Sequence, residues 1–365
     1  MAFSGLMISG STKSEHAPRF VTICGEGGHQ VSLQGRKIFI TGGAGFIGSH
    51  IVEDMVAKGA RVTIYDDFSS GLMSNLHAVA KDVKIVRGNI MDFASLKRAM
   101  KGAEIVTHQA AHLEITKCIL DPIDDLTVNT VGTLNVLKAA AAHKVGKFIY
   151  ASSACVYGQA EYVPEDEDRH PTNPNWAYGA AKLAGEKYCR IYSELHDMQT
   201  VGLRYAIIYG PREWYGRVLT IFLKRALAGK APVVFGDGKQ LRDFTYVDDL
   251  VDLHARCLTR NTGAHEIFNV STGVGTSIRK LAQTVLKVTG LGGKPVFEAI
   301  EEGERSALVD EKRERLPCEL QRMVLDPAKA KRKLRWTPKV TLAEGLRREY
   351  EWLSQNPRRW KKMSY

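Results

Sequence analysis

A tyrosine and a lysine four positions apart, Tyr178 and Lys182, form the pair in this 365-residue chain that is best suited to move a proton. Residues with this spacing lie on one face of a helix. An ammonium group beside a phenol favours the phenolate, so we expect the pKa of Tyr178 to fall toward the working pH. Such a phenolate can take a proton from a hydroxyl group while a hydride leaves the same carbon.

A serine hydroxyl is expected to complete this set. Ser152 and Ser153 follow a short apolar run that begins at Phe148. Active sites of doubly wound sheets gather where parallel strands end. A hydroxyl at this place can bridge the substrate oxygen and the phenol of Tyr178.

Three glycines in the run TGGAGFIG, at 41–48, predict a site for a dinucleotide. Gly42 allows a tight turn, Gly45 lets the backbone approach a pyrophosphate, and Gly48 lets a helix pack close to a strand. The unpaired N–H groups and the positive dipole of the following helix then face the phosphates. Asp66 ends the next apolar run, where a carboxylate accepts hydrogen bonds from ribose hydroxyls. No arginine follows it directly, which favours NAD over NADP.

Alternating strands and helices must position these residues. Short apolar runs predict strands at 37–41, 61–65, 83–86, 104–108, 148–152 and 200–205. Helical spacing predicts helices at 49–58, 93–100, 121–143 and 176–195 between them. The expected fold class is therefore α/β, a Rossmann-like doubly wound parallel sheet with helices on both faces.

The regular alternation of strands and helices ends after Gly210. Beyond it we expect helices at 217–228, 277–289 and 341–354, separated by irregular stretches. We expect a smaller, mixed C-terminal cap that binds substrate, formed by about 211–230 and 266–365. Residues 35–210 plus about 231–265 would form the NAD-binding domain. Residues 1–34 are expected to form an N-terminal extension that is partly disordered.

Composition narrows the class of protein. Apolar residues make up 44% of the chain and charged residues 25%, which is usual for a globular protein. The net charge of +11 is dispersed apart from basic runs at 329–335 and 358–362, so we expect an anionic ligand such as a diphosphate rather than nucleic acid. The six cysteines lack metal-ligand spacing, and no apolar run reaches ~20 residues. No metal, no membrane span and a cytoplasmic location are expected.

In this order, the motifs resemble those of the extended short-chain dehydrogenase/reductase family, in its NAD-dependent epimerase/dehydratase branch, with members like UDP-glucose 4-epimerase. The resemblance rests on the runs at 41–48, 152–158 (SSACVYG), 178–182 (YGAAK) and 236–249 (GDGKQLRDFTYVDD), and it covers roughly residues 36–350. It places Ser153, Tyr178 and Lys182 as the catalytic serine, tyrosine and lysine. It also implies a homodimer.

The resemblance further implies which residues line the NAD site. They are Gly42, Gly45, Phe46, Ile47, Gly48, Asp66, Asn89, Ile90, Ala110, Ala111, Asn129, Tyr178 and Lys182. Asn89 stands where many members have aspartate, and its amide oxygen is expected to accept from the adenine amino group.

The residues after the serine indicate the reaction. In the family, 4,6-dehydratases carry an Asp-Glu pair there and uronate decarboxylases a glutamate, whereas 4-epimerases carry a small uncharged pair. This chain has Ala154 and Cys155. The resemblance thus favours a nucleotide-sugar 4-epimerase that works through a transient 4-keto sugar and regenerates NAD. The alternatives are a 3,5- or 5-epimerase in which Cys155 exchanges protons, a dehydrogenase or reductase, and, least favoured, an NAD-binding module without activity.

The substrate side is expected to include Ser153, Cys155, Phe235 and Arg242, with Val233 beside the nucleobase. Arg242 matches an arginine that holds the diphosphate or nucleotide, a task suited to the guanidinium fork. In the run PREWYGR, Arg212 and Arg217 can either frame a sugar acid or diphosphate or simply pack at the surface. Two departures from the family pattern, Ile207 for an asparagine and 316–319 (LPCE) for an Arg-Pro-Gly-Asp-like run, weaken the case for an ordinary UDP-hexose.

Overall fold

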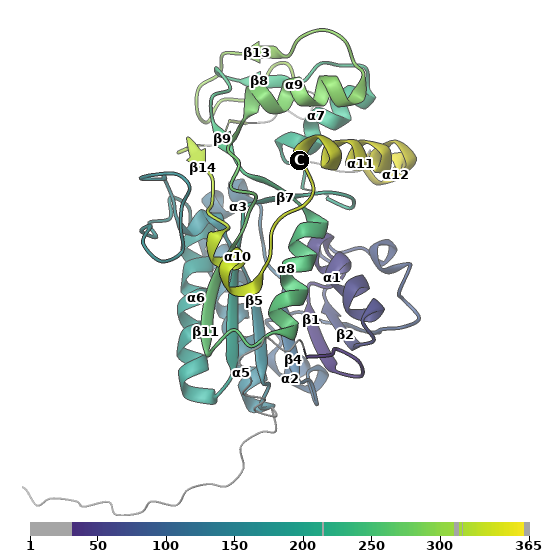
Figure 1. Ribbon diagram of the computed structural model, residues 1–365, viewed down its shortest axis with the longest axis vertical. Helices are drawn as coiled ribbons and strands as arrows, with labels where there is room; N and C mark the ends of the chain where they lie inside the picture. Colours follow the sequence, from purple (N-terminus) through teal and green to yellow (C-terminus); the bar gives the residue numbers. More distant parts are fainter. Residues whose placement is uncertain (1–30, 214, 310–313, 316, 361–365) are drawn as a thin grey trace, which may run out of the picture.

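Seven parallel strands form the central sheet of the protein (Figure 1). The computed structural model describes residues 31–213, 215–309, 314–315 and 317–360. In spatial order the strands are β11 (His265–Val270), β6 (Gln199–Tyr205), β5 (Lys147–Ser153), β4 (Ile105–His108), β1 (Lys37–Thr41), β2 (Arg61–Asp66) and β3 (Lys84–Arg87). The strand order reverses between β1 and β4, and a doubly wound sheet binds ligands at such a point.

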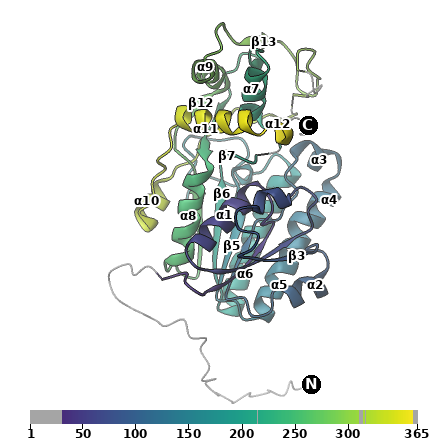
Figure 2. The same ribbon diagram turned by 90° about the vertical axis from the view of Figure 1, so that its right-hand side faces the viewer.

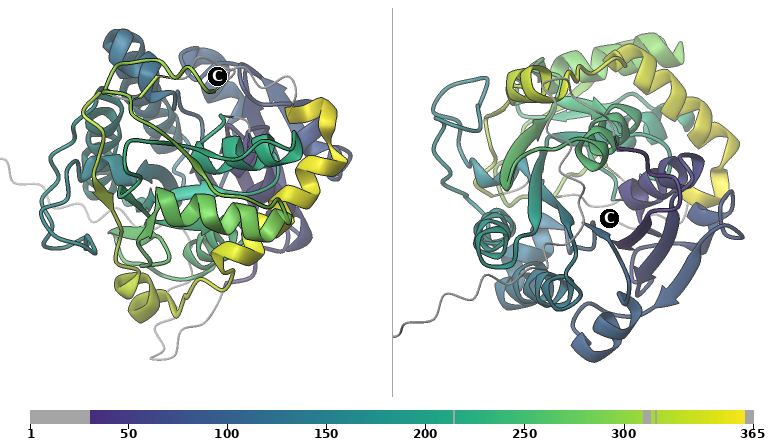
Figure 3. Two further views of the ribbon diagram at one scale, coloured as in Figure 1. Left: turned by 90° about the horizontal axis from the view of Figure 1, so that it is seen from above. Right: turned by 60° about the horizontal axis from the view of Figure 1, so that its bottom comes forward.

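Helices cover both faces of the sheet, as the view from below shows (Figure 3, right). One layer contains α1 (Phe46–Ala57) and α8 (Val247–Thr259), which pack on each other. The other contains α2 (Phe93–Ala99), α5 (Thr133–Ala142) and α6 (Ala177–His196). The middle strands β1, β4 and β5 read as apolar runs because the helices bury both of their sides. The predicted fold class is confirmed.

The helix expected over 121–143 is present, with a π-helical turn in its middle. The chain forms a short α3 (Ile115–Leu120) and then, without a break, α4 (Pro122–Leu126), the π-helical turn η2 (Thr127–Gly132) and α5. Pro122 occupies the first turn of α4, where its missing N–H costs no hydrogen bond, and the Asp121 carboxylate accepts from Asp124 N. A new helix therefore starts at Pro122.

The smaller C-terminal part lies at one end of the sheet (Figures 1 and 2). Its helices are α7 (Val218–Leu227), α9 (Ile278–Thr289) and α11 (Leu342–Gln355). Its strands pair as β8 (Val233–Phe235) with β13 (Val296–Glu298), and as β12 (Thr276–Ser277), β9 (Leu241–Arg242) and β14 (Arg322–Met323) in one small mixed sheet. Between the two parts, β7 (Ile207–Tyr209) pairs with β10 (Phe244–Tyr246). The remaining short elements are η1 (Met73–Leu76), η3 (Ala154–Val156), α10 (Ala328–Leu334) and α12 (Pro357–Trp360).

The expected domain bounds stay a prediction. β11, which spans the expected boundary near 265, pairs with β6 in the main sheet, whereas β8 and β9 pair in two small sheets outside it. Most of the expected N-terminal extension, residues 1–30, lies outside the described residues. Residues 31–34 pack on the main domain, because Val31 N donates to Thr259 O and Leu33 is buried in the core.

Candidate active site

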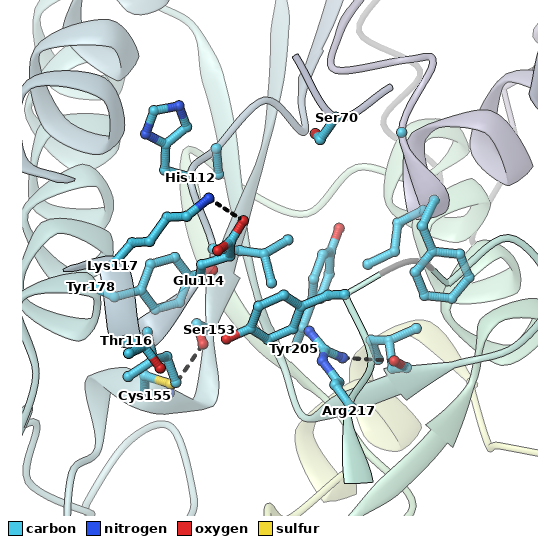
Figure 4. A pocket seen from close by; sticks show the side chains of 18 of the residues that line it. Ser70, His112, Glu114, Thr116, Lys117, Ser153, Cys155, Tyr178, Tyr205 and Arg217 are labelled. Atoms are coloured by element: carbon cyan, nitrogen blue, oxygen red, sulfur yellow. Dashed lines mark hydrogen bonds and ion pairs between the residues drawn. The ribbon is translucent and has the colours of Figure 1, made fainter. Parts of the chain in front are cut away.

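A cavity of about 1040 Å³ lies between the carboxyl ends of the strands and the cap (Figure 4). Its walls include the glycine turn, the ends of β2, β4 and β5, the start of α6 and parts of the cap. Almost every residue predicted for cofactor or substrate lines this one cavity. The sequence motifs thus meet at the point where the strand order reverses.

The glycine turn has the conformation that its residue types require. Gly42 has φ +68°, which an L side chain rarely adopts, and a Cβ atom there would meet Ala110 N at 2.6 Å. A Cβ atom on Gly48 would meet Gly42 O at 2.1 Å. On Gly45 it would meet only Gly42 O, at 3.2 Å. The fold itself therefore excludes side chains at Gly42 and Gly48, and Gly45 leaves the wall of the cavity open in front of α1.

Asp66 ties the glycine turn to the end of β2. Its Oδ2 accepts from Ala44 N and its Oδ1 from Phe68 N, both at 2.9 Å. Burial raises the pKa of the Asp66 carboxyl, and these two backbone donors oppose that shift. The carboxylate lines the cavity and retains lone pairs for ribose hydroxyls.

The neighbouring residue, Asp67, was not predicted. Asn89 donates its amide N–H to Asp67 Oδ2 at 2.9 Å, and its amide oxygen accepts from Met91 N at 2.8 Å. Both residues line the cavity. The expected bond from adenine to the Asn89 oxygen stays a prediction, and Asp67 supplies a second acceptor beside it.

Five more residues that were expected at the NAD site line the cavity. They are Phe46, Ile47, Ile90, Ala110 and Ala111.

Asn129 is the exception, since it is buried and not part of the cavity wall. Its Oδ1 accepts from His112 N at 3.0 Å, and its Nδ2 donates to His112 O and Asp125 Oδ1. Asn129 therefore holds the loop after β4 through these bonds, and its expected place at the NAD site stays a prediction.

The catalytic set is assembled by close packing of α6 against the end of β5. Gly179 lies so near η3 that a Cβ atom would meet Cys155 O at 2.4 Å. This contact brings the adjacent Tyr178 beside Ser153 and Cys155, as Figure 4 shows. Further along α6, Glu186 receives two hydrogen bonds from Arg204 of β6, of 2.9 and 2.8 Å, in a buried pair that anchors the helix.

The two serines of β5 point to different partners because side chains alternate along a strand. Ser152 donates to Glu186 Oε1 at 2.5 Å and so belongs to the anchor of α6. Both serines line the cavity, and Ser153 Oγ accepts from Cys155 N at 3.1 Å. Figure 4 shows Ser153 beside Tyr178 in the cavity.

The electrostatics of Tyr178 differ from the expectation. Burial raises the pKa of Tyr178 well above its usual range, so the expected fall is wrong for the protein chain alone. Burial also lowers the pKa of Lys182 to about 8, and the buried Asp125 opposes this shift. Lys182 Nζ donates to Ala151 O at 2.9 Å, which fixes the ammonium beneath the Tyr178 ring.

Two arginines of the cap share one glutamate. Arg242 Nη2 lies 3.4 Å from Glu319 Oε1, and Arg315 Nε lies 3.2 Å from Glu319 Oε2. All three residues line the cavity, as do Val233 and Phe235 of β8. Arg315 precedes the run that departs from the family pattern, and it still reaches the cavity. Leu316 lies outside the described residues.

A segment that was not predicted, 112–117, forms another wall. Glu114, Thr116 and Lys117 line the cavity, and Lys117 Nζ donates to Glu114 Oε1 at 2.8 Å (Figure 4). Ile207, noted above as a departure, lies in the wall as well. The only sequence signal for this segment was its place directly after β4, at the expected ligand edge of the sheet.

The cavity suits a dinucleotide. A glycine turn without side chains, the N-terminus of α1 with no side-chain cap, and Asp66 at the end of β2 are the features that NAD requires. Among the described residues, no group of three or more His, Cys, Asp or Glu could hold a metal ion, and no helix is long and apolar enough to cross a membrane.

Comparison with known proteins gives one family. The model of the NAD dependent epimerase/dehydratase family matches residues 38–271. A putative UDP-glucose 4-epimerase from Methanocaldococcus jannaschii is 34% identical over 326 residues, which are 88% of this chain and 99% of that protein. The chain belongs to the NAD-dependent epimerase/dehydratase family. Its cofactor is NAD.

Other family members show the range of activities. The UDP-glucose 4-epimerase of Mycolicibacterium smegmatis is 36% identical over 86% of this chain and 97% of its own. A crystal structure of UDP-glucose 4-epimerase from Thermotoga maritima with UDP-glucose has a TM-score of 0.79 at 32% identity, covering 88% of this chain and 99% of that one. A UDP-N-acetyl-alpha-D-glucosaminuronate decarboxylase from Bacillus cytotoxicus is 32% identical over 88% of this chain and 98% of its own. Family membership therefore identifies a sugar-modifying enzyme that uses NAD and leaves several reactions open.

Proposed function

We propose that this protein is a nucleotide-sugar 4-epimerase. The observation that carries the proposal is the pair Ala154 and Cys155, which follows Ser153 in the cavity wall and presents no carboxylate. Family members that remove water or carbon dioxide carry a carboxylate at these positions. Without one, the site retains the parts needed to oxidise and reduce a single carbon.

The chain's own groups account for the proton steps. Tyr178 takes the proton of the sugar C4 hydroxyl and later returns it, while Ser153 holds that oxygen. The glycine turn and Asp66 would hold NAD, which would supply the acceptor and donor for the C4 hydride. The protonated Lys182 stabilises the phenolate. The sugar must turn its other face between the two transfers, so the product differs from the substrate only at C4 and no cofactor is consumed.

The test is direct incubation of the purified protein with UDP-glucose, UDP-galactose and their N-acetylamino and uronate counterparts. Nuclear magnetic resonance of the products should show inversion at C4 without net NADH. Steady accumulation of NADH, or loss of water or carbon dioxide, would refute the proposal. In deuterated water, label at C3 or C5 would instead favour proton exchange by Cys155, which lines the same cavity.

We also propose that the protein forms a homodimer through the segment from α3 to η2. Leu120, Ile123, Leu126 and Val131 are 79, 69, 48 and 41% exposed in this segment. Four large apolar side chains exposed within twelve residues are unusual on a monomer, and a second copy of the same face would cover them.

A further inference from the structure

The two arginines of the segment 210–217 have different surroundings. Arg212 Nη2 donates to both carboxylate oxygens of Glu53, at 2.7 and 2.8 Å, and Arg212 Nη1 donates to Ser49 Oγ. Arg212 does not line the cavity, whereas Arg217 does. Arg212 therefore joins the cap segment to α1, and only Arg217 is available to a ligand.

Arg217 has no acidic partner among the residues that the structure describes. Its one hydrogen bond there runs from NH1 to Ile208 O, at 2.7 Å. The nearby carboxylate of Glu213 is used by Tyr215 N, at 2.7 Å, and by the Thr220 hydroxyl. The half-buried guanidinium of Arg217 therefore keeps N–H groups that are open to the cavity and available to a ligand.

The guanidinium of Arg217 lies at the reactive end of the cavity. Figure 4 shows it on the cavity wall together with Ser153, Cys155 and Tyr178. Burial raises the pKa of Tyr178 and of Cys155, and in both cases the charge of Arg217 opposes the shift. The positive charge of Arg217 thus acts on Tyr178 and Cys155, the groups expected to surround the reacting carbon.

Two other arginines of the cavity share an acidic partner. Arg242 and Arg315 both pair with Glu319 in the cap, in the wall that also contains Phe235 and Val233, where the nucleotide half is expected. Arg217 comes from a different element, the residue before α7. An anion bound there would belong to the sugar half of the ligand.

We propose that Arg217 binds a carboxylate on the sugar ring, so that the preferred substrates are nucleotide hexuronates, which carry the carboxylate on C5, next to the reacting C4. This inference rests on the proposed function for the ring chemistry. A planar guanidinium can form two parallel hydrogen bonds with a carboxylate, which fixes the ring as well as binding it. The Glu114 carboxylate, which also lines the cavity, repels this anion only weakly because Glu114 is already paired with Lys117.

The test measures binding without turnover. NAD-loaded Tyr178→Phe protein is titrated with UDP-glucuronate and with UDP-glucose in a calorimeter, with and without Arg217→Gln. We expect UDP-glucuronate to bind about 10-fold or more tightly than UDP-glucose, and Arg217→Gln to weaken UDP-glucuronate by about 10- to 100-fold but UDP-glucose by less than about 3-fold. Arg217→Lys should retain part of the preference because it retains the charge.

Arg212→Gln is the matched control, since it removes the same charge from the same segment but outside the cavity, and it should leave both affinities unchanged. Equal weakening of both sugars by Arg217→Gln, or no preference in the parent protein, would overturn the inference. Turnover separates it from the proposed function. If UDP-glucose is inverted at C4 but Arg217→Gln weakens both sugars equally, the proposed epimerase is supported and the carboxylate site is refuted. If the protein prefers UDP-glucuronate but inverts neither sugar, the carboxylate site is supported and the proposed epimerase is refuted.

Discussion

Lys182 Nζ lies 5.7 Å from the centroid of the Tyr178 ring, one turn further along α6. The lysine donates its hydrogen bond to the backbone at Ala151 O. The ammonium therefore acts on the phenol through its charge and is held in place by β5. The roles of Tyr178 as proton acceptor and of Lys182 as a nearby charge can therefore be tested separately.

Replacing Tyr178 by Phe should remove the proton acceptor and leave the fold intact, because the ring still fills its place beside η3. We expect kcat to fall by about 10²–10⁴-fold. NAD content and melting temperature should stay near those of the parent protein. Tyr192→Phe, on the same helix but away from the cavity, serves as the control. Unchanged turnover in Tyr178→Phe would show that Tyr178 is not the proton acceptor, and absence of turnover in the parent protein with every sugar tested would favour the NAD-binding module without activity.

The glycines of the turn should respond differently to alanine. Gly48→Ala places a Cβ atom 2.1 Å from Gly42 O, so the turn must shift and both the melting temperature and the NAD affinity should fall. Gly45→Ala meets only Gly42 O at 3.2 Å. We expect it to melt within a few degrees of the parent when NAD is removed, and to lose NAD affinity by about 10-fold or more because the methyl group occupies space next to the phosphates. Thermal melting and NAD titration of both variants check this contrast, and unchanged NAD binding by Gly45→Ala would contradict it.

Lys182 should make stability depend on pH in a definite direction. Its pKa is about 8 in the folded protein and 10.5 in the unfolded chain, so the unfolded state binds more protons between these values. The lysine's contribution to stability therefore rises from pH 8 to pH 10.5 and is least favourable below pH 8.

Lys182→Met removes this titration. We expect the variant to be inactive and, relative to the parent protein, more stable at pH 7 by about 1–3 kcal/mol, an advantage that shrinks as the pH rises to 10. The free energy of unfolding in urea at pH 7, 8, 9 and 10 measures the difference. A difference that does not change with pH would show that the ammonium of Lys182 is not destabilised by burial.

The proposed dimer should depend on the apolar segment from α3 to η2. Ile123→Glu places a charge on a side chain that is 69% exposed, which a monomer tolerates and a buried interface does not. Light scattering after size-exclusion chromatography should show a dimer for the parent protein and a monomer for the variant. Val274→Glu, at a position that is 62% exposed elsewhere, should remain dimeric. A parent protein that elutes as a monomer would refute the dimer.

Local rules of sequence were enough to predict the alternating strands and helices, the glycine turn with Asp66, and the pair Tyr178 and Lys182. They depend on periodicity, on the stereochemistry of glycine and on spacing along one helix, all of which are local properties. The helix expected over 121–143 was predicted in the same way, and only its π-helical turn at 127–132 was not. The choice of Ser153 over Ser152 came from the resemblance to the family.

Tertiary structure decided what depends on neighbours distant in sequence. Asn129 turns toward His112 and Asp125, and burial reverses the expected pKa shift of Tyr178. Arg212 and Arg217 are five residues apart in one short run, and the sequence could not distinguish their roles. The partners of the two arginines separate them: Arg212 is bound by Glu53 of α1, while Arg217 enters the cavity without an acidic partner among the described residues. The role of a charged side chain follows from the groups that surround it in space, and these come together only when the chain folds.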